Sequence, residues 1–246
     1  ALGSPWSISR MLDRLESRRL KVWESALVER FPLTTAITEH DSHYISLSNP
    51  PLVIPTHVGD CLSYRPTSNP LLSEHSVIFF GEMSTFYSES AVLFAFEQVM
   101  PLVWLRFPEA VLYVVGSRPT SKIAGLACKR VVVTGFVEDI RPYVSSADVA
   151  IVPLFMGSGL KTKIIQSMAL RVPVVSTTIA NEGIDGKPEE HILIADDAIL
   201  FAESIVRLLE SPSLRRRIVS EAYHFVSERY SDKAVSARLS AVLGAA

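Results

Sequence analysis

A loop at residues 153–163 has the residue types that could hold a phosphate group. It contains two glycines, Gly157 and Gly159, and then two lysines, Lys161 and Lys163. The loop follows an apolar stretch and precedes a helical pattern, so free amides at a helix N-terminus and lysine ammonium groups would meet there. Such a loop suits a diphosphate. The spacing alone fits an ordinary β-α turn with two surface lysines equally well.

Other phosphate-binding motifs are missing from the sequence. No Walker A pattern occurs, and no G-x-G-x-x-G follows the first strand of the regular region. Mononucleotide hydrolysis and the binding of a nicotinamide dinucleotide therefore have weaker support than diphosphate binding at 153–163.

From residue 76 onward, short apolar runs alternate with helical patterns. Runs as continuous as 149–153 have no polar face, which is typical of parallel strands covered on both faces. The strands are predicted at 77–81, 110–116, 130–134, 149–153, 173–176 and 191–195. The helices are predicted at 88–107, 140–147, 160–170, 198–210, 214–230 and 233–243. The fold class is therefore α/β, a Rossmann-like parallel sheet with helices on both faces.

Ligands of an open parallel sheet bind beyond the carboxyl ends of its strands, where loops meet helix N-termini. The loops at that edge are expected at 81–89, 116–122, 135–139, 154–163 and 177–186. A binding site is therefore expected to combine residues from several of these loops.

The N-terminal part of the chain has a different pattern. Residues 9–30 carry apolar side chains at three- and four-residue intervals, which predicts an amphipathic helix. Glutamates balance its basic run at 18–21, which indicates a solvated face, with peripheral contact to an anionic membrane as the alternative. Short strands are predicted at 34–38 and 52–55, and the Pro-, Ser- and Asn-rich stretch 61–75 is predicted to be a linker.

Composition excludes several classes of function. A net charge of −2 with interspersed charges gives no basic field for nucleic acid. No apolar run could span a bilayer, and the N-terminus lacks the pattern of a secretory signal. Cys61, Cys128 and the six histidines lack metal-ligand or disulfide spacing, so we expect a cytoplasmic protein without metal or cofactor. Residues 1–5 are interpreted as a processed or engineered end.

Several motifs, in the same order along the chain, resemble glycosyltransferase family 4. They lie at 135–143, 147–153, 157–169, 173–183 and 191–231, within a resemblance that covers about 76–240. The family has the GT-B architecture, which implies that residues 76–246 form a nucleotide-sugar-binding domain. Weaker similarity at 15–31, 36–41 and 53–55 implies that residues 1–60 are a small α/β remnant of the family's N-terminal domain, joined by the linker 61–75.

The same resemblance implies which residues bind the donor nucleotide. Gly81 matches the loop glycine beneath the phosphates, and Phe136 and Val137 match the position that holds the base. Simple packing at a strand end is the structural alternative for the latter two. Glu182 matches a loop that often approaches the donor sugar. No catalytic residue is assigned.

The charged residues of the family are partly replaced. Its two glutamates, separated by seven residues, correspond to Ser158 and Gln166, and an amide such as that of Gln166 can still donate and accept hydrogen bonds to hydroxyls. The basic residues that often follow the first glycine are also missing. Lys161, helped by Lys163 and the amides at 157–159, is therefore expected to bind the diphosphate.

These residues favour one function and leave two alternatives open. The first is transfer of a hexose from a UDP- or GDP-sugar to a glycan or lipid-linked acceptor, with retention of configuration, in the cytoplasm or at the inner face of the membrane. The second is a catalytically incomplete nucleotide-sugar-binding subunit or degenerate homologue, which needs a partner chain to supply the missing N-terminal domain. A GT-B sugar-nucleotide epimerase fits the pattern at 157–169 less well.

Overall fold

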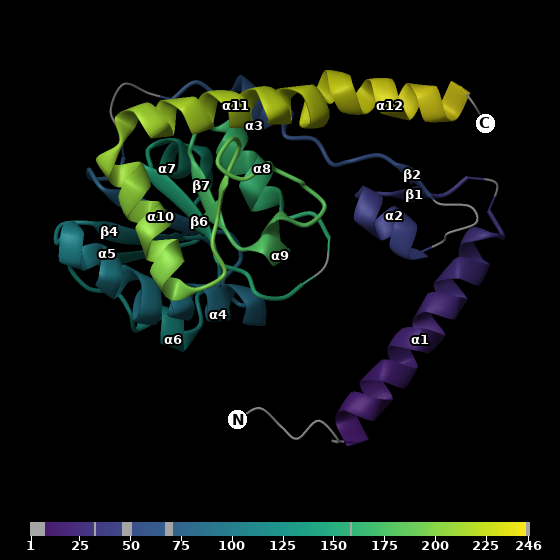
Figure 1. Ribbon diagram of the computed structural model, residues 1–246, viewed down its shortest axis with the longest axis horizontal. Coiled ribbons are helices and arrows are strands. Elements are labelled where there is room, and N and C mark those ends of the chain that lie inside the picture. Colours follow the sequence, from purple (N-terminus) through teal and green to yellow (C-terminus); the bar gives the residue numbers. More distant parts are fainter. Residues whose placement is uncertain (1–7, 32, 46–50, 67–70, 158, 245–246) are drawn as a thin grey trace. The chain divides into compact units, whose positions relative to one another are not determined.

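The computed structural model describes residues 8–31, 33–45, 51–66, 71–157 and 159–244 (Figure 1). The chain divides into two compact units. One is Thr56–Val235, and the other consists of Ala1–Pro55 with Ser236–Ala246. The large sheet and all the predicted donor-binding residues that the structure describes belong to Thr56–Val235.

The smaller unit contains a long helix and a short parallel strand pair. Helix α1 (Ile8–Val28) confirms the predicted amphipathic helix, and it leaves apolar side chains uncovered, with Trp23 61% exposed. Strand β1 (Thr35–Ala36) pairs in parallel with β2 (Leu52–Val53), and α2 (Glu39–Ile45) lies between them in sequence. Both predicted strands are therefore present, with shorter bounds.

Among the described residues, six parallel strands form the large sheet in the order β5-β4-β3-β6-β7-β8. They are β3 (Ser76–Phe80), β4 (Val111–Val115), β5 (Val131–Gly135), β6 (Val149–Val152), β7 (Val174–Ser176) and β8 (Leu193–Ile194). Every predicted strand of this region is present. The order is the one found in Rossmann folds, and the predicted α/β fold class is confirmed.

Helices cover both faces of the sheet. Figure 1 shows α4, α5 and α6 on one side of the strands and α7, α8 and α11 on the other. The bounds are α3 (Gly59–Ser63), α4 (Phe86–Phe94), η1 (Ala95–Val99), α5 (Met100–Arg106), α6 (Ser121–Ala124), α7 (Arg141–Ser145), α8 (Thr162–Ala169), α9 (Thr178–Asn181), α10 (Ala198–Glu210), α11 (Pro212–Tyr230) and α12 (Asp232–Gly244). In the described part of the chain, no helix has both the length and the apolar character needed to cross a bilayer.

The helix predicted at 88–107 is divided in the structure. The π-helix η1 separates α4 from α5, and the amide of Met100 donates to the carbonyl of Ala95. Pro101 has no amide hydrogen to donate and its ring crowds the preceding turn, so a regular α-helix cannot run through this position. The prediction of one continuous helix was therefore wrong at its centre.

Three short helices were not predicted, and one lies at the boundary of the predicted linker. Helices α6 and α9 each begin after a threonine whose side chain accepts an amide hydrogen bond, and α3 begins at Gly59. Cys61 and Leu72, within the predicted linker 61–75, belong to the buried core of the larger unit. The boundaries 1–60, 61–75 and 76–246 stay a prediction, while the compact units divide between Pro55 and Thr56.

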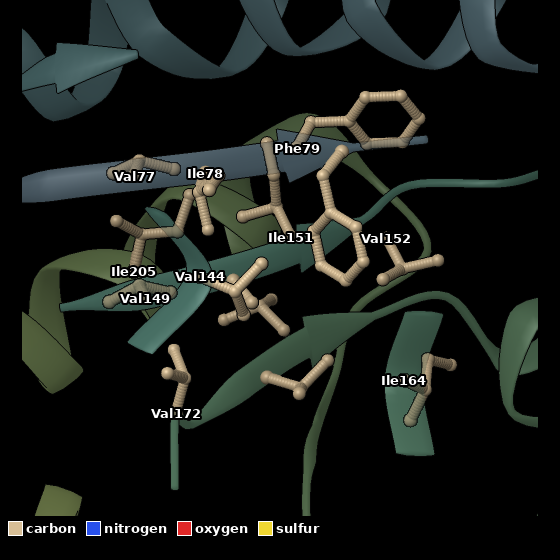
Figure 2. Close-up of a cluster of buried hydrophobic side chains, with 14 of the residues drawn as sticks. Val77, Ile78, Phe79, Val144, Val149, Ile151, Val152, Ile164, Val172 and Ile205 are labelled. Atoms are coloured by element: carbon tan, nitrogen blue, oxygen red, sulfur yellow. The ribbon is translucent and has the colours of Figure 1, made fainter. Parts of the chain in front are cut away.

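The core lies around the two central strands. All five residues of β3 are buried, and Figure 2 shows Ile78 and Phe79 of β3, Ile151 of β6 and Ile205 of α10 among the buried apolar side chains of this region. Burial of one large apolar side chain contributes about 1.5–3 kcal/mol, so many such residues fix β3 and β6 firmly. The carboxyl ends of these two strands are thereby held in place for the loops that follow them.

Candidate functional site

The candidate site lies where the direction of the chain through the sheet reverses. From β3 the chain continues to β4 and β5 on one side, and from β6 it continues to β7 and β8 on the other. Helices that follow β3 and β6 therefore leave on opposite faces, which opens a crevice at the carboxyl ends of these strands. The loops at 81–85 and 153–161 border this crevice.

Gly81 is the first residue after β3, and its backbone requires glycine. Its φ is +135°, which L side chains rarely adopt, and its amide donates to the carbonyl of Val115 at 3.0 Å. A Cβ at this position would lie 3.4 Å from the Nζ atom of Lys163. The absence of a side chain at Gly81 therefore leaves room for the Lys163 ammonium group directly beside the loop backbone.

Lys163 extends from the first turn of α8 into this crevice. Its Nζ lies 4.3 Å from the ring centroid of Phe79, at a distance typical of a cation–π contact. Within the described parts of the chain, no carboxylate forms an ion pair with it. Burial, and then the charge of Lys161, lower the pKa of Lys163 to about 8. A half-buried, unpaired ammonium group is well placed to bind an anion.

Lys161 forms hydrogen bonds within its own loop. Its Nζ donates to the carbonyl oxygens of Gly157 at 3.1 Å and Gly159 at 2.7 Å. Both glycines have positive φ, +107° and +75°, so the loop is tightly curved and Lys161 closes it. Gly157 also faces the ring of Tyr87, because a Cβ there would lie 3.9 Å from that ring. Ser158 lies outside the described residues.

Gln166 lies one turn further along α8 and lines a second part of the crevice. This cavity has a volume of about 600 Å³ and is lined by Asp60, Cys61, Glu138, Asp139, Ile140, Arg141 and Gln166. The sequence placed 135–139 among the loops of the binding edge, but it gave no indication that α3 contributes. The signal for α3 is Cys61, an apolar-type side chain within a polar stretch, which is buried in the structure.

Asp139 and Arg141 neutralise one another at the start of α7. The Arg141 guanidinium donates from Nε to Oδ1 at 2.9 Å and from a terminal nitrogen to Oδ2 at 2.9 Å, and the Arg141 amide donates to Oδ1 at 2.9 Å. These bonds from Arg141 lower the pKa of the Asp139 carboxyl group. Burial raises the pKa of the Cys61 thiol, which makes this cysteine a poor nucleophile.

The remaining predicted site residues divide into three situations. Phe136 is 77% exposed at the carboxyl edge of the sheet, whereas Val137 packs against the core, as its structural alternative proposed. Glu182 is exposed at the end of α9, and within the described residues it forms no ion pair with Lys163. No three His, Cys, Asp or Glu side chains in the described parts are placed to hold a metal ion.

The order of the parallel strands and the loops at their carboxyl ends define a Rossmann-like domain. The model of the family "Glycosyl transferases group 1" matches residues 74–211, more than half of the chain. The chain belongs to this family, and the resemblance drawn from its motifs is confirmed at that level.

Two curated bacterial proteins are similar to part of the chain. The "putative teichuronic acid biosynthesis glycosyltransferase TuaC" of Bacillus subtilis (strain 168) is 29% identical over 126 residues, 50% of this chain and 31% of that protein. An "uncharacterized 44.6 kDa protein in cps region" of Klebsiella pneumoniae is 35% identical over 83 residues, 34% of this chain and 21% of that protein. The similarity therefore spans less than a third of the length of either relative.

Solved structures share the fold at low sequence identity. TarM from S. aureus has a TM-score of 0.73 at 14% identity, with 90% of this chain and 45% of that chain covered. HepE from Anabaena, crystallised with UDP-glucose, has 0.74 at 16%, covering 90% and 66%. Sucrose-phosphate synthase from Thermosynechococcus elongatus has 0.74 at 21%, covering 92% and 61%.

Proposed function

We propose that this chain is the donor-binding part of a glycosyltransferase and that it binds a nucleotide sugar in the crevice at β3 and β6. The observation that carries the proposal is the unpaired ammonium group of Lys163 beside the glycine backbone at Gly81. A diphosphate placed there would meet this charge and the free amides at the N-terminus of α4, whose first residue is Phe86.

The two lysines have different roles in this proposal. Lys163 neutralises the diphosphate, while Lys161 holds the loop at 157–159 in its curved form through bonds to Gly157 and Gly159. When the bond between sugar and diphosphate breaks, negative charge grows on the diphosphate oxygens. An ammonium group that is already in place stabilises that charge without reorganisation, so no metal or cofactor is required.

The reaction proposed is transfer of a hexose from a UDP- or GDP-sugar to a glycan or lipid-linked acceptor with retention of configuration. The groups that hold the acceptor are proposed to resemble those in the part of the longer relatives that this chain does not match. The name of the B. subtilis relative, a putative teichuronic acid biosynthesis glycosyltransferase, supports a role in polysaccharide biosynthesis, and the location proposed with it is the cytoplasm or the inner face of the membrane.

A second candidate function is supported by one residue of the crevice. Gln166 lines the cavity where the resemblance places a family glutamate, so the local negative charge of that glutamate is absent. A nucleotide-sugar-binding subunit that needs a partner chain would tolerate this change. Turnover of the donor with an acceptor, measured for this chain alone and with a full-length relative, distinguishes an enzyme from such a subunit.

A panel of nucleotides tests the proposal directly. UDP, GDP, UDP-glucose and GDP-mannose are each added to the chain, and the melting temperature is followed. A ligand that binds only the folded state raises stability by about 2.7 kcal/mol at a hundred times its Kd. We expect at least one diphosphate to raise the melting temperature and the matching nucleoside to do so much less. No shift with any of the four would contradict the proposal.

Diphosphate affinity is expected to fall as the pH rises above about 8. Burial and Lys161 lower the pKa of Lys163 to about 8 in the free protein, and a bound diphosphate raises it again. Between these two pKa values binding takes up a proton, so affinity falls by up to about tenfold per pH unit, while below the lower value it stays flat.

Isothermal titration of a nucleotide sugar from about pH 7 to about pH 9 measures this dependence, because the diphosphate of the donor has no titrating proton in that range and the ring N–H of its base ionises mostly above it. The Lys163→Arg variant is the control, since a guanidinium group stays charged throughout. A profile that is equally steep in Lys163→Arg would assign the dependence to another group.

A further inference from the structure

Gln166, which lines the cavity, lies one helical turn after Lys163 on α8. Residues three apart on a helix are neighbours on one face, about 5–6 Å apart at their Cβ atoms. Lys163 and Gln166 have this spacing on α8. We expect a diphosphate bound at Lys163 to direct its nucleoside towards the cavity of about 600 Å³ at Gln166.

The loop after β5 presents alternate side chains to this end of the crevice. Phe136 and Glu138 are exposed, while Val137 between them packs against the core. Both exposed residues follow the end of β5 at Gly135. The carboxylate of Glu138 lines the cavity, and the aromatic ring of Phe136 belongs to the same loop two residues earlier.

The available hydrogen-bonding groups in the cavity are mainly acceptors. Asp139 is bound to Arg141, and Arg141 also lies 5.4 Å from the ring centroid of Tyr64. The side chain of Glu138 forms no ion pair or hydrogen bond with any described residue, so both of its oxygens can accept. A carboxylate accepts two parallel N–H bonds but cannot donate when it is ionised.

We propose that Glu138 makes the crevice selective for guanine, so that the donor is a GDP-sugar. This inference rests on the proposed function. Guanine presents two adjacent donors, N1–H and the 2-amino group, which match the two oxygens of one carboxylate. Uracil presents a single N–H between two carbonyl oxygens, and those oxygens would face the negative charge of Glu138. Phe136 provides an apolar surface on which the larger purine ring stacks.

Titration of GDP, inosine diphosphate and UDP against the wild-type chain and Glu138→Gln tests the assignment. Inosine diphosphate keeps N1–H and lacks only the 2-amino group, so it isolates one of the two bonds. We expect GDP to bind wild type about tenfold to a hundredfold more tightly than UDP, with inosine diphosphate between them. In Glu138→Gln, GDP affinity is expected to fall about tenfold or more, and the difference from inosine diphosphate is expected to shrink. Glu97→Gln, at an exposed glutamate of η1, is the matched control and should change nothing.

The possible results separate this inference from the proposed function. Equal binding of GDP and UDP, or an unchanged preference in Glu138→Gln, overturns the selectivity and leaves diphosphate binding intact. Binding of none of the three diphosphates overturns both. Loss of all three to the same extent in Glu138→Gln would show a role in folding instead of base recognition, and it would also overturn the assignment.

Discussion

The substitution Gly116→Ala is expected to destabilise the larger unit by about 3 kcal/mol and to abolish nucleotide binding. Gly116 follows β4 with a φ of +147°, and a Cβ there would lie only 1.7 Å from the carbonyl oxygen of Gly81. No side-chain rotation relieves this overlap, because both groups belong to the backbone. Gly81 must move, and the space beside Lys163 changes with it. Thermal denaturation and titration with GDP and UDP measure the two effects.

Two other glycines separate backbone strain from steric overlap. Gly135, the last residue of β5, has a φ of +70°, but a Cβ there would meet no described atom within 4 Å, so Gly135→Ala should lose only about 1–2 kcal/mol of stability. Gly244 in α12 has open space around it in the described part of the chain and no positive φ, so Gly244→Ala should be neutral or slightly stabilising. If Gly116→Ala lowered the stability no more than Gly135→Ala does, the close approach of Gly116 to Gly81 would not explain the loss.

Lys163→Met is expected to weaken the binding of UDP and GDP by about tenfold to a hundredfold, with little change for the nucleosides. Charge-assisted hydrogen bonds contribute about 1.5–3 kcal/mol, which corresponds to that range. Methionine keeps the length of the chain and its contact with Phe79 while it removes the charge. Because an unpaired, half-buried ammonium group opposes folding, the same variant is expected to be at least as stable as wild type. Lys163→Met is therefore expected to lower diphosphate affinity without lowering the stability of the fold. Removal of a lysine with only a structural role would lower stability as well.

Two further variants make the comparison quantitative. Lys187→Met removes an exposed lysine that pairs with Glu190, and it should leave binding unchanged. Lys161→Ala breaks bonds to Gly157 and Gly159, so it should weaken diphosphate binding less than Lys163→Met does. Equal small losses for nucleoside and diphosphate in Lys163→Met would remove Lys163 from the site.

The sequence alone predicted the strands of the larger unit because each is a continuous apolar run with clear limits. Residues 149–153, for example, correspond to β6, whose residues are all buried. The short helices α6 and α9 were missed because a single turn has too few residues to show a helical period, and only the capping threonines mark it. The π-helix within 88–107 depends on how one turn adapts to Pro101, which periodicity does not show.

The candidate site was predicted in part for a similar reason. Lys161 and Lys163 were identified from a local motif and Gly81 from the family resemblance, and the structure brings Gly81 and Lys163 together. The position of the Lys163 ammonium group depends on its contact with Phe79, far earlier in the chain, and no local pattern contains that information. Asp60 and Glu138 line the same cavity because α3 packs near α8, and this contact is likewise absent from any local pattern.

The complete burial of β3 has a consequence for hydrogen exchange. This strand pairs with β4 on one side and β6 on the other, so its amides can exchange with solvent only when a large part of the unit opens. In the loop at 81–85, the amides of Gly81 and Met83 donate to Val115 and Ser117, but this loop and the described residues at 153–157 lie outside the strands and can open at smaller cost. A ligand that orders these loops would therefore slow the hydrogen exchange of the loop amides, while the exchange rates of the β3 amides would stay the same.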